Sequence, residues 1–125
     1  MDRKADVPEP YSFELLESLL RKGAICGAAI VRESGDDEEI LRIVGDFGLL
    51  NSQLVESAIE QVASFARPVL IDLAFCSYVD MSALSVLVRA KRALKQRLKI
   101  SSPEDGRARR VFDLAGVSGW LIASD

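Results

Sequence analysis

The stretch that most constrains the fold runs from Pro68 to Arg89 and changes its hydrophobic period part-way along. Val69–Leu73 is a short apolar run behind a proline and contains β-branched residues, which is typical of a strand buried on both faces. From Ala83 onward the apolar residues recur at helical spacing, with polar and basic residues between them. The stretch therefore predicts a buried strand, a turn and an amphipathic helix.

Asp80 and Ser82 lie at the junction between this strand and this helix. The first turn of a helix has unpaired N–H groups and a partial positive charge, so a hydroxyl there can cap the helix and a phosphate there is stabilised. Ser82 is therefore interpreted both as a helix cap and as a candidate switch residue, and the residues alone leave the two open.

Strands and helices alternate on either side of this stretch. Ala28–Arg32 and Glu39–Val44 predict a β-hairpin around an acidic turn that contains a glycine. A helix follows from near Asn51 or Ser52, where we expect capping rather than ligand binding, and a further strand follows at 98–101. Because strands separated by crossover helices favour a parallel or mixed sheet, the predicted fold class is α/β with a hairpin at its N-terminal side.

The C-terminal part carries its own helix signals. Ser102 and Pro103 followed by two acids predict a helix start, and Gly116 predicts the end of that helix. Trp120 and the two apolar residues after it are expected to close the core.

Residues 1–26 are expected to form an N-terminal extension, and residues 27–125 a single domain. Within the extension, Tyr11–Lys22 predicts a short amphipathic helix. Its apolar stripe must dock on the domain, on another protein or on a second copy of the chain, so a homodimer remains an open alternative.

Composition excludes several kinds of chemistry. The 125 residues contain no histidine, which removes Ser-His-Asp and Cys-His catalysis. Cys26 and Cys76 are far apart and lack metal-ligand spacing, so they are expected to be reduced cytosolic thiols, with a redox pair as the alternative. No glycine loop of the Walker or dinucleotide type occurs. We therefore expect no enzyme activity, no cofactor and no metal site.

Charge is distributed unevenly along the chain. Residues 1–87 carry 7 Lys/Arg and 15 Asp/Glu, whereas residues 88–125 carry 9 and 4. The basic residues from Arg89 to Lys99 lie along an amphipathic helix without interleaved aromatics, which favours a solvated helix face over direct nucleic-acid binding. No apolar run approaches the roughly 20 residues of a membrane span, and the charged N-terminus leads to no signal sequence. A cytoplasmic protein is expected.

Three motifs give the chain a family resemblance: Gly45-Asp46-Phe47, the run from Leu70 to Leu84, and Arg109–Val117. On these motifs, about residues 27 to 123 resemble the STAS family, the anti-anti-sigma factors (anti-sigma factor antagonists) of bacterial regulation. The resemblance implies a STAS-like mixed β-sheet of four to five strands packed by helices, and a protein that binds partners without catalysis.

The resemblance also implies a role for the junction. In the family the junction typically reads Asp, Ser, Ser, Gly, Leu, and a partner kinase that is also an anti-sigma factor phosphorylates the second serine. That serine corresponds to Ser82, whereas Met81 and Ala83 stand at the positions of the first serine and the glycine. The expected contact surface consists of Asp46, Phe47, Asp80, Met81, Ala83, Ser85 and Arg89.

The expected function is therefore an anti-sigma factor antagonist that binds an anti-sigma factor serine kinase and is switched by phosphorylation at Ser82. A PP2C-type phosphatase is a further candidate partner. The alternative is a non-phosphorylated STAS scaffold or adaptor subunit of a stress-signalling or lipid-transport complex.

Overall fold

A mixed five-stranded sheet forms the centre of the computed structural model, which describes residues 28–103 and 106–122. Its strands are β1 (Ala28–Ser34), β2 (Glu39–Phe47), β3 (Val69–Asp72), β4 (Cys76–Val79) and β5 (Leu98–Ser101). Strand β2 pairs antiparallel with β1 and parallel with both β3 and β4, and β5 pairs in parallel with β3. The predicted α/β class and the N-terminal hairpin are confirmed.

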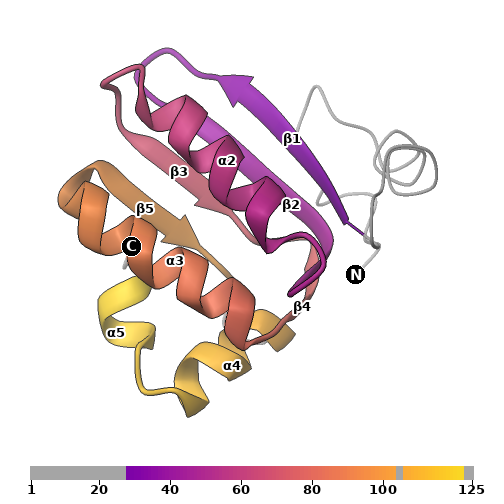
Figure 1. Cartoon of the computed structure of the whole chain (residues 1–125). Helices are drawn as coiled ribbons and strands as arrows, with labels where there is room; N and C mark the ends of the chain where they lie inside the picture. Colours follow the sequence, from indigo (N-terminus) through magenta and orange to yellow (C-terminus); the bar gives the residue numbers. More distant parts are fainter. Residues whose placement is uncertain (1–27, 104–105, 123–125) are drawn as a thin grey trace.

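Helices follow the strands and cover the sheet (Figure 1). They are α2 (Ser52–Ala63), α3 (Met81–Leu94), α4 (Arg107–Leu114) and α5 (Ser118–Leu121), with a 3₁₀ turn, η2 (Lys95–Arg97), between α3 and β5. Helices α2 and α3 lie side by side over one face of the sheet, and α4 contacts β4. Each long helix turns an apolar stripe towards the strands, as its sequence period predicts.

The core lies between the sheet and these helices. Its largest fully buried side chains include Phe47 of β2 and Phe112 of α4, with Ile71 of β3 and Leu87 of α3 between the layers. Complete burial of a side chain of this size contributes about 1.5–3 kcal/mol relative to exposure. These contacts therefore hold the end of β2 firmly against the helices.

Strand β2 is longer than its hydrophobic pattern predicts, since it continues past Val44 to Phe47. The extension depends on Gly45, which has a φ of 96°, a conformation that favours glycine. The register between β2 and β4 shifts between Gly45 and Asp46, so a bulge lies at this point. Asp46 and Phe47 therefore belong to β2, beyond the predicted end of this strand at Val44.

Strand β4 was not predicted, because Cys76–Val79 was interpreted as part of a turn. Its burial runs buried, exposed, exposed, buried, which lacks the strict alternation of a half-buried strand. Only the pairing of Tyr78 and Val79 with the end of β2 reveals it.

The predicted start of the last helix is wrong, whereas its predicted end is confirmed. Helix α4 has Gly106 rather than Ser102 at its N-cap, and the Gly106 N–H donates to the Pro103 carbonyl at 3.1 Å. At the other end Gly116 has a φ of 74°. The N–H of Gly116 and that of Val117 donate to Asp113 and Phe112, both at 3.1 Å, which is a Schellman motif.

The expectation for the C-terminal residues is right in part. Leu121 is fully buried and Ile122 nearly so, but Trp120 is 48% exposed and does not close the core. The predicted N-terminal extension at 1–26, its helix at Tyr11–Lys22 and Cys26 lie outside the described residues. In the part of the chain that the structure describes, no helix combines the length and apolarity needed to cross a membrane.

Candidate partner-binding site at the start of α3

Asp80 joins the start of α3 to the loop after β2. Its backbone is extended at the N-cap position, and its Oδ1 accepts a hydrogen bond from the Ala83 N–H at 3.0 Å. The other carboxylate oxygen, Oδ2, accepts from the Leu49 N–H at 2.9 Å. A negative charge at this position also interacts favourably with the helix dipole. The cap of α3 is therefore Asp80, and the interpretation of Ser82 as the cap is wrong.

The loop approaches Asp80 so closely that it requires glycine at Gly48. A Cβ atom at this position would lie 2.7 Å from Asp80 Oδ2. The backbone also links the two segments, since the Asp80 N–H donates to the Phe47 carbonyl at 3.3 Å. Strand β2, its loop and the start of α3 are thus held as one unit.

The Asn51 side chain forms two hydrogen bonds to the backbone of the same segment. Its side chain is buried, and Oδ1 accepts from the Gly48 N–H at 2.9 Å while Nδ2 donates to the Asp46 carbonyl at 2.7 Å. Asn51 occupies the N-cap position of α2 but makes no side-chain capping bond there. The expectation that it caps the helix is therefore wrong, and its amide instead shapes the loop that carries the site.

Ser82 is the second residue of α3 and is half-buried. Within the described residues its hydroxyl makes no hydrogen bond, so the oxygen is available to a partner. Its position in the first helical turn places it where backbone N–H groups and the positive end of the helix dipole favour an anion.

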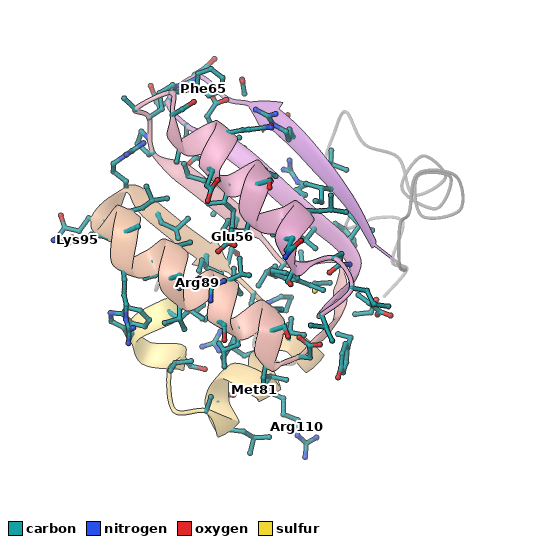
Figure 2. All side chains as sticks on the ribbon, viewed as in Figure 1. Glu56, Phe65, Met81, Arg89, Lys95 and Arg110 are labelled. Atoms are coloured by element: carbon teal, nitrogen blue, oxygen red, sulfur yellow. The ribbon has the colours of Figure 1, made fainter. Side chains whose placement is uncertain are left out.

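Large apolar side chains are exposed on the three segments that meet at Asp80: the loop after β2, the strand β4 and the start of α3. Leu49 is 71% exposed, Leu50 76%, Tyr78 53% and Met81 66%. Figure 2 shows Met81 at the beginning of α3. Large apolar side chains exposed together commonly mark a protein interaction site. We call Leu49, Leu50, Tyr78 and Met81 the apolar rim.

A shallow cavity of about 190 Å³ lies inside the rim, between the loop and β4. Its lining combines Leu49, Leu50 and Tyr78 with the polar residues Asp46, Asn51 and Asp80. Sequence reasoning missed Leu49, Leu50 and Tyr78. The leucine pair directly after a glycine and before a helix was the available signal, because apolar residues in such a loop are not needed by either element.

The structure brings together part of the predicted contact surface. Asp80 and Met81 directly precede Ser82 at the start of α3, and Asp46, exposed at the end of β2, lines the cavity with Asp80. Phe47 and Ala83 are 0% exposed, so the prediction that they line a contact surface is wrong: their side chains belong to the core.

Ser85 and Arg89 lie further along α3, about one and two turns beyond the site, and both are exposed. Arg89 is engaged across the helix pair, where its guanidinium contacts Glu56 of α2 at 2.9 Å (Figure 2). Among the described residues no group of three or more Cys, Asp or Glu side chains is placed to hold a metal ion.

A comparison with protein-family models identifies the family to which this fold belongs. The family model described as "Mlab, STAS domain" matches residues 30–123, which is most of the chain. The chain belongs to the STAS domain family. The match covers the sheet, the apolar rim and the junction, so the site lies on the family's common fold. The search of curated proteins gives no match to this STAS domain.

Solved structures with similar folds include an anti-sigma factor antagonist from Mycobacterium paratuberculosis. It is 18% identical, with a TM-score of 0.67, and the match covers 78% of this chain and 86% of that one. SpoIIAA in its unphosphorylated form is 17% identical with a TM-score of 0.60, covering 78% and 89%. The Bacillus cell fate determinant SpoIIAA in its phosphorylated form is 16% identical with a TM-score of 0.57, covering 78% and 92%. The predicted STAS-like fold is confirmed.

Proposed function

We propose that this STAS domain is a non-enzymatic anti-sigma factor antagonist that binds an anti-sigma factor serine kinase through the apolar rim and is switched by phosphorylation of Ser82. The observation that carries the proposal is a hydroxyl without a hydrogen-bond partner among the described residues in the first turn of α3, next to the exposed Met81 and to Asp80, which holds the loop of the exposed Leu49 and Leu50. Folds similar to this one occur in anti-sigma factor antagonists, one of them solved in both unphosphorylated and phosphorylated forms. This precedent supports the proposal for Ser82.

In the proposed step the Ser82 oxygen attacks the γ-phosphorus of ATP, the Ser82 proton leaves to a base on the kinase, and ADP is released. The modification adds about 1.5–2 negative charges next to Met81 of the apolar rim. A partner that packs against Leu49 and Met81 would then have to desolvate that charge, so binding weakens. The fold tolerates the phosphate because a helix N-terminus stabilises an anion.

Asp80 extends the effect of the phosphate to the loop. The new anion competes with Asp80 for the N–H groups of the first turn and repels its carboxylate, which also holds the Leu49 N–H at 2.9 Å. Weakening of that bond releases Leu49 and Leu50, so the rim changes shape as well as charge. A PP2C-type phosphatase would reverse the switch, and the cytoplasm, where ATP and the kinase meet, is the proposed compartment.

The test combines the purified full chain, ATP and each serine kinase of the anti-sigma factor type from the same cell. We expect a mass gain of about 80 Da, the mass of one added phosphoryl group. Ser82→Ala should abolish the gain, whereas Ser85→Ala, at an exposed serine one turn further along α3, should keep it. No gain in the wild type, or a gain that persists in Ser82→Ala, would refute the switch.

A second function is favoured by the rim itself, since its four exposed apolar side chains can bind a protein without any phosphate. The STAS domain would then be a constitutive adaptor subunit. Partner affinity measured for Ser82→Asp and Met81→Ser separates the two functions. If Ser82→Asp binds as tightly as the wild type while Met81→Ser loses at least ten-fold, the adaptor function is supported and the switch is rejected.

Light scattering on the full chain and on a chain lacking residues 1–26 tests assembly through the N-terminal extension. Loss of a dimer on truncation would favour the adaptor function, and an unchanged monomer would favour the simple antagonist.

A further inference from the structure

Two buried valines lie outside the hydrophobic core between the sheet and its helices. Val31 of β1 is 8% exposed and Val44 of β2 is 4% exposed, yet neither belongs to the cluster of buried side chains that forms this core. Leu41 and Ile43 of β2 belong to it, and alternate residues of a strand share a face. Val44 therefore points to the other face of the sheet. Val31 shares that face, because it is paired with Arg42 across the two strands.

We call this other face of β1, β2 and β3 the outer face. Its side chains are those that alternate with the core residues: Val31, Glu33, Ile40, Arg42, Val44, Leu70 and Asp72. An ion network crosses it, since the Arg42 guanidinium lies 2.6 Å from a Glu33 carboxylate oxygen and 3.2 Å from one of Asp72. The Arg42 side chain is only 11% exposed. A sheet face in water is normally lined by polar residues, whereas four of these seven side chains are apolar.

None of the described helices covers the outer face. Each of α2, α3, α4 and α5 contributes buried side chains to the core cluster, with Phe112 from α4 and Leu121 from α5 among them. Figure 1 shows α2 and α3 over that same side of the sheet. Side chains that stand on an open sheet face keep their outward surface in water, but Val31 and Val44 do not. The burial and the apolar composition of the outer face are those of a surface packed against another segment.

The chain before β1 is the nearest candidate for that segment. Ala28, the first residue of β1, is paired with Gly45, so residues 1–27 lead into the sheet next to Val44. The expected helix Tyr11–Lys22 has 12 residues and a length of about 18 Å. The five residues 23–27 between this helix and β1 span up to about 17 Å, and three neighbouring strands extend over only about 10 Å. The expected helix can therefore reach and cross the outer face.

The sequence of this segment also fits the outer face. Phe13, Leu16 and Leu20 recur at spacings of three and four, which places them on one stripe of a helix, and Glu17 flanks the stripe. Lys99 of β5 alternates with core residues and is exposed at the border of the outer face. It has no hydrogen-bond or ion-pair partner in the part of the chain that the structure describes. The two surfaces thus match in apolar side chains and in opposite charges.

We propose that Tyr11–Lys22 is a helix that packs on the outer face of its own STAS domain, with its apolar stripe against Val31 and Val44. The five-residue connection holds the segment at an effective concentration on the order of millimolar, which favours the same chain over a second copy. Asp46 and Tyr78, which are paired at the end of β2 and line the partner cavity, continue the outer face beyond Val44. The packed helix therefore borders the apolar rim. The proposal does not depend on the phosphorylation switch.

Urea unfolding of the full chain, followed by circular dichroism, tests the packing. Leu16→Ser removes an apolar side chain from the middle of the stripe and should lower the urea midpoint by about 0.5 M or more. Leu15→Ser is the matched control, because Leu15 points away from the stripe on the expected helix. It makes the same change of residue type and should leave the urea midpoint nearly unchanged. Both residues precede β1, so neither substitution opens the core between the sheet and its described helices.

A double-mutant cycle locates the contact. Val44→Ala should lower the urea midpoint in the wild type, and by at most half as much in Leu16→Ser, where the packed surface is already lost. Val55→Ala is the control, because Val55 of α2 is fully buried in the core cluster on the opposite face of the sheet. Its effect on the urea midpoint should be the same in both backgrounds, since the sheet separates the two sites.

Light scattering and protein concentration distinguish the chain's own segment from other occupants. We expect a monomer whose urea midpoint does not change with protein concentration. The proposal is overturned by a dimer that Leu16→Ser dissociates and whose urea midpoint rises with concentration, because a second copy then covers the outer face. It is also overturned if Leu16→Ser leaves the urea midpoint unchanged, if Leu15→Ser lowers it equally, or if Val44→Ala lowers it as much in both backgrounds. In these cases an occupant other than this segment covers the outer face.

Discussion

Removal of the Asp80 carboxylate should destabilise the protein more than any other single change at the site. Asp80→Ala loses the cap bond to the Ala83 N–H at 3.0 Å and the bond to the Leu49 N–H at 2.9 Å. Loss of an N-cap costs about 1 kcal/mol. A hydrogen bond to a charged group contributes about 1.5 kcal/mol or more, and the lower value applies because Leu49 is exposed. The free energy of unfolding should therefore fall by about 2–3 kcal/mol.

Urea unfolding followed by circular dichroism measures this change. We expect a midpoint lower by about 1 M or more at an unchanged slope. Asp80→Asn keeps a capping oxygen and should lose only about 1 kcal/mol. Ser82→Ala is the control and should stay within about 0.5 kcal/mol, because its hydroxyl is not part of the cap. A loss below about 0.5 kcal/mol for Asp80→Ala, or an equal loss for Ser82→Ala, would refute the assignment of the cap.

A double-mutant cycle tests the close approach of the loop to the same carboxylate. Gly48→Ala places a Cβ atom 2.7 Å from Asp80 Oδ2, which must move and lose its bond to the loop. We expect a cost of about 1.5 kcal/mol in the wild type and almost none in Asp80→Ala. Costs that simply add in the double variant would show that Gly48 matters for another reason.

Other changes test the core, the end of α4 and the buried thiol. Phe47→Ala should cost about 3–5 kcal/mol in urea unfolding, because its side chain is fully buried, whereas a residue on a contact surface would cost little. Gly116→Ala should cost about 1 kcal/mol, because Gly116 has a φ of 74°. Burial raises the pKa of Cys76 from 9.0 to about 11. In a Cys26→Ser background the thiol should therefore react slowly with a disulfide reagent at pH 8 until urea is added, and stability should fall as the pH rises from 9.0 towards about 11, where only the unfolded thiol has ionised.

Much of the fold could be predicted because the local patterns agree with the tertiary structure. Hydrophobic periodicity and turn residues predict the buried strand β3, the hairpin and the apolar stripes of α2 and α3. Strand β4 could not be predicted in this way, because its place depends on pairing with a bulged β2 rather than on its own alternation. The start of α4 was misplaced because Gly106, whose N–H donates to the Pro103 carbonyl, takes the N-cap position that the local signal assigned to Ser102.

The sequence predicted the polar residues of the candidate site at the start of α3, but it did not predict the apolar rim. Asp80 and Ser82 follow from the change of period at the junction, and their neighbours in sequence follow with them. The rim was missed because Leu49 and Leu50 are about thirty residues away from Asp80 in the sequence, and the Leu49 N–H meets the Asp80 carboxylate only in the folded structure. Phe47 was misassigned because neighbouring strand residues point to opposite faces, so Asp46 can be exposed while Phe47 is buried.

The α/β class, the STAS resemblance and the junction between a strand and a helix beside Ser82 were predictable without a structure, because all three depend on residues close together in the chain. Three findings required the three-dimensional structure: Asp80 rather than Ser82 caps α3, large apolar side chains are exposed on the segments that meet at Asp80, and Trp120 lies at the basic end of the same helix. These three findings have the same physical cause. Each depends on contacts between distant segments, whose geometry follows from core packing and strand pairing and leaves no local periodic signal.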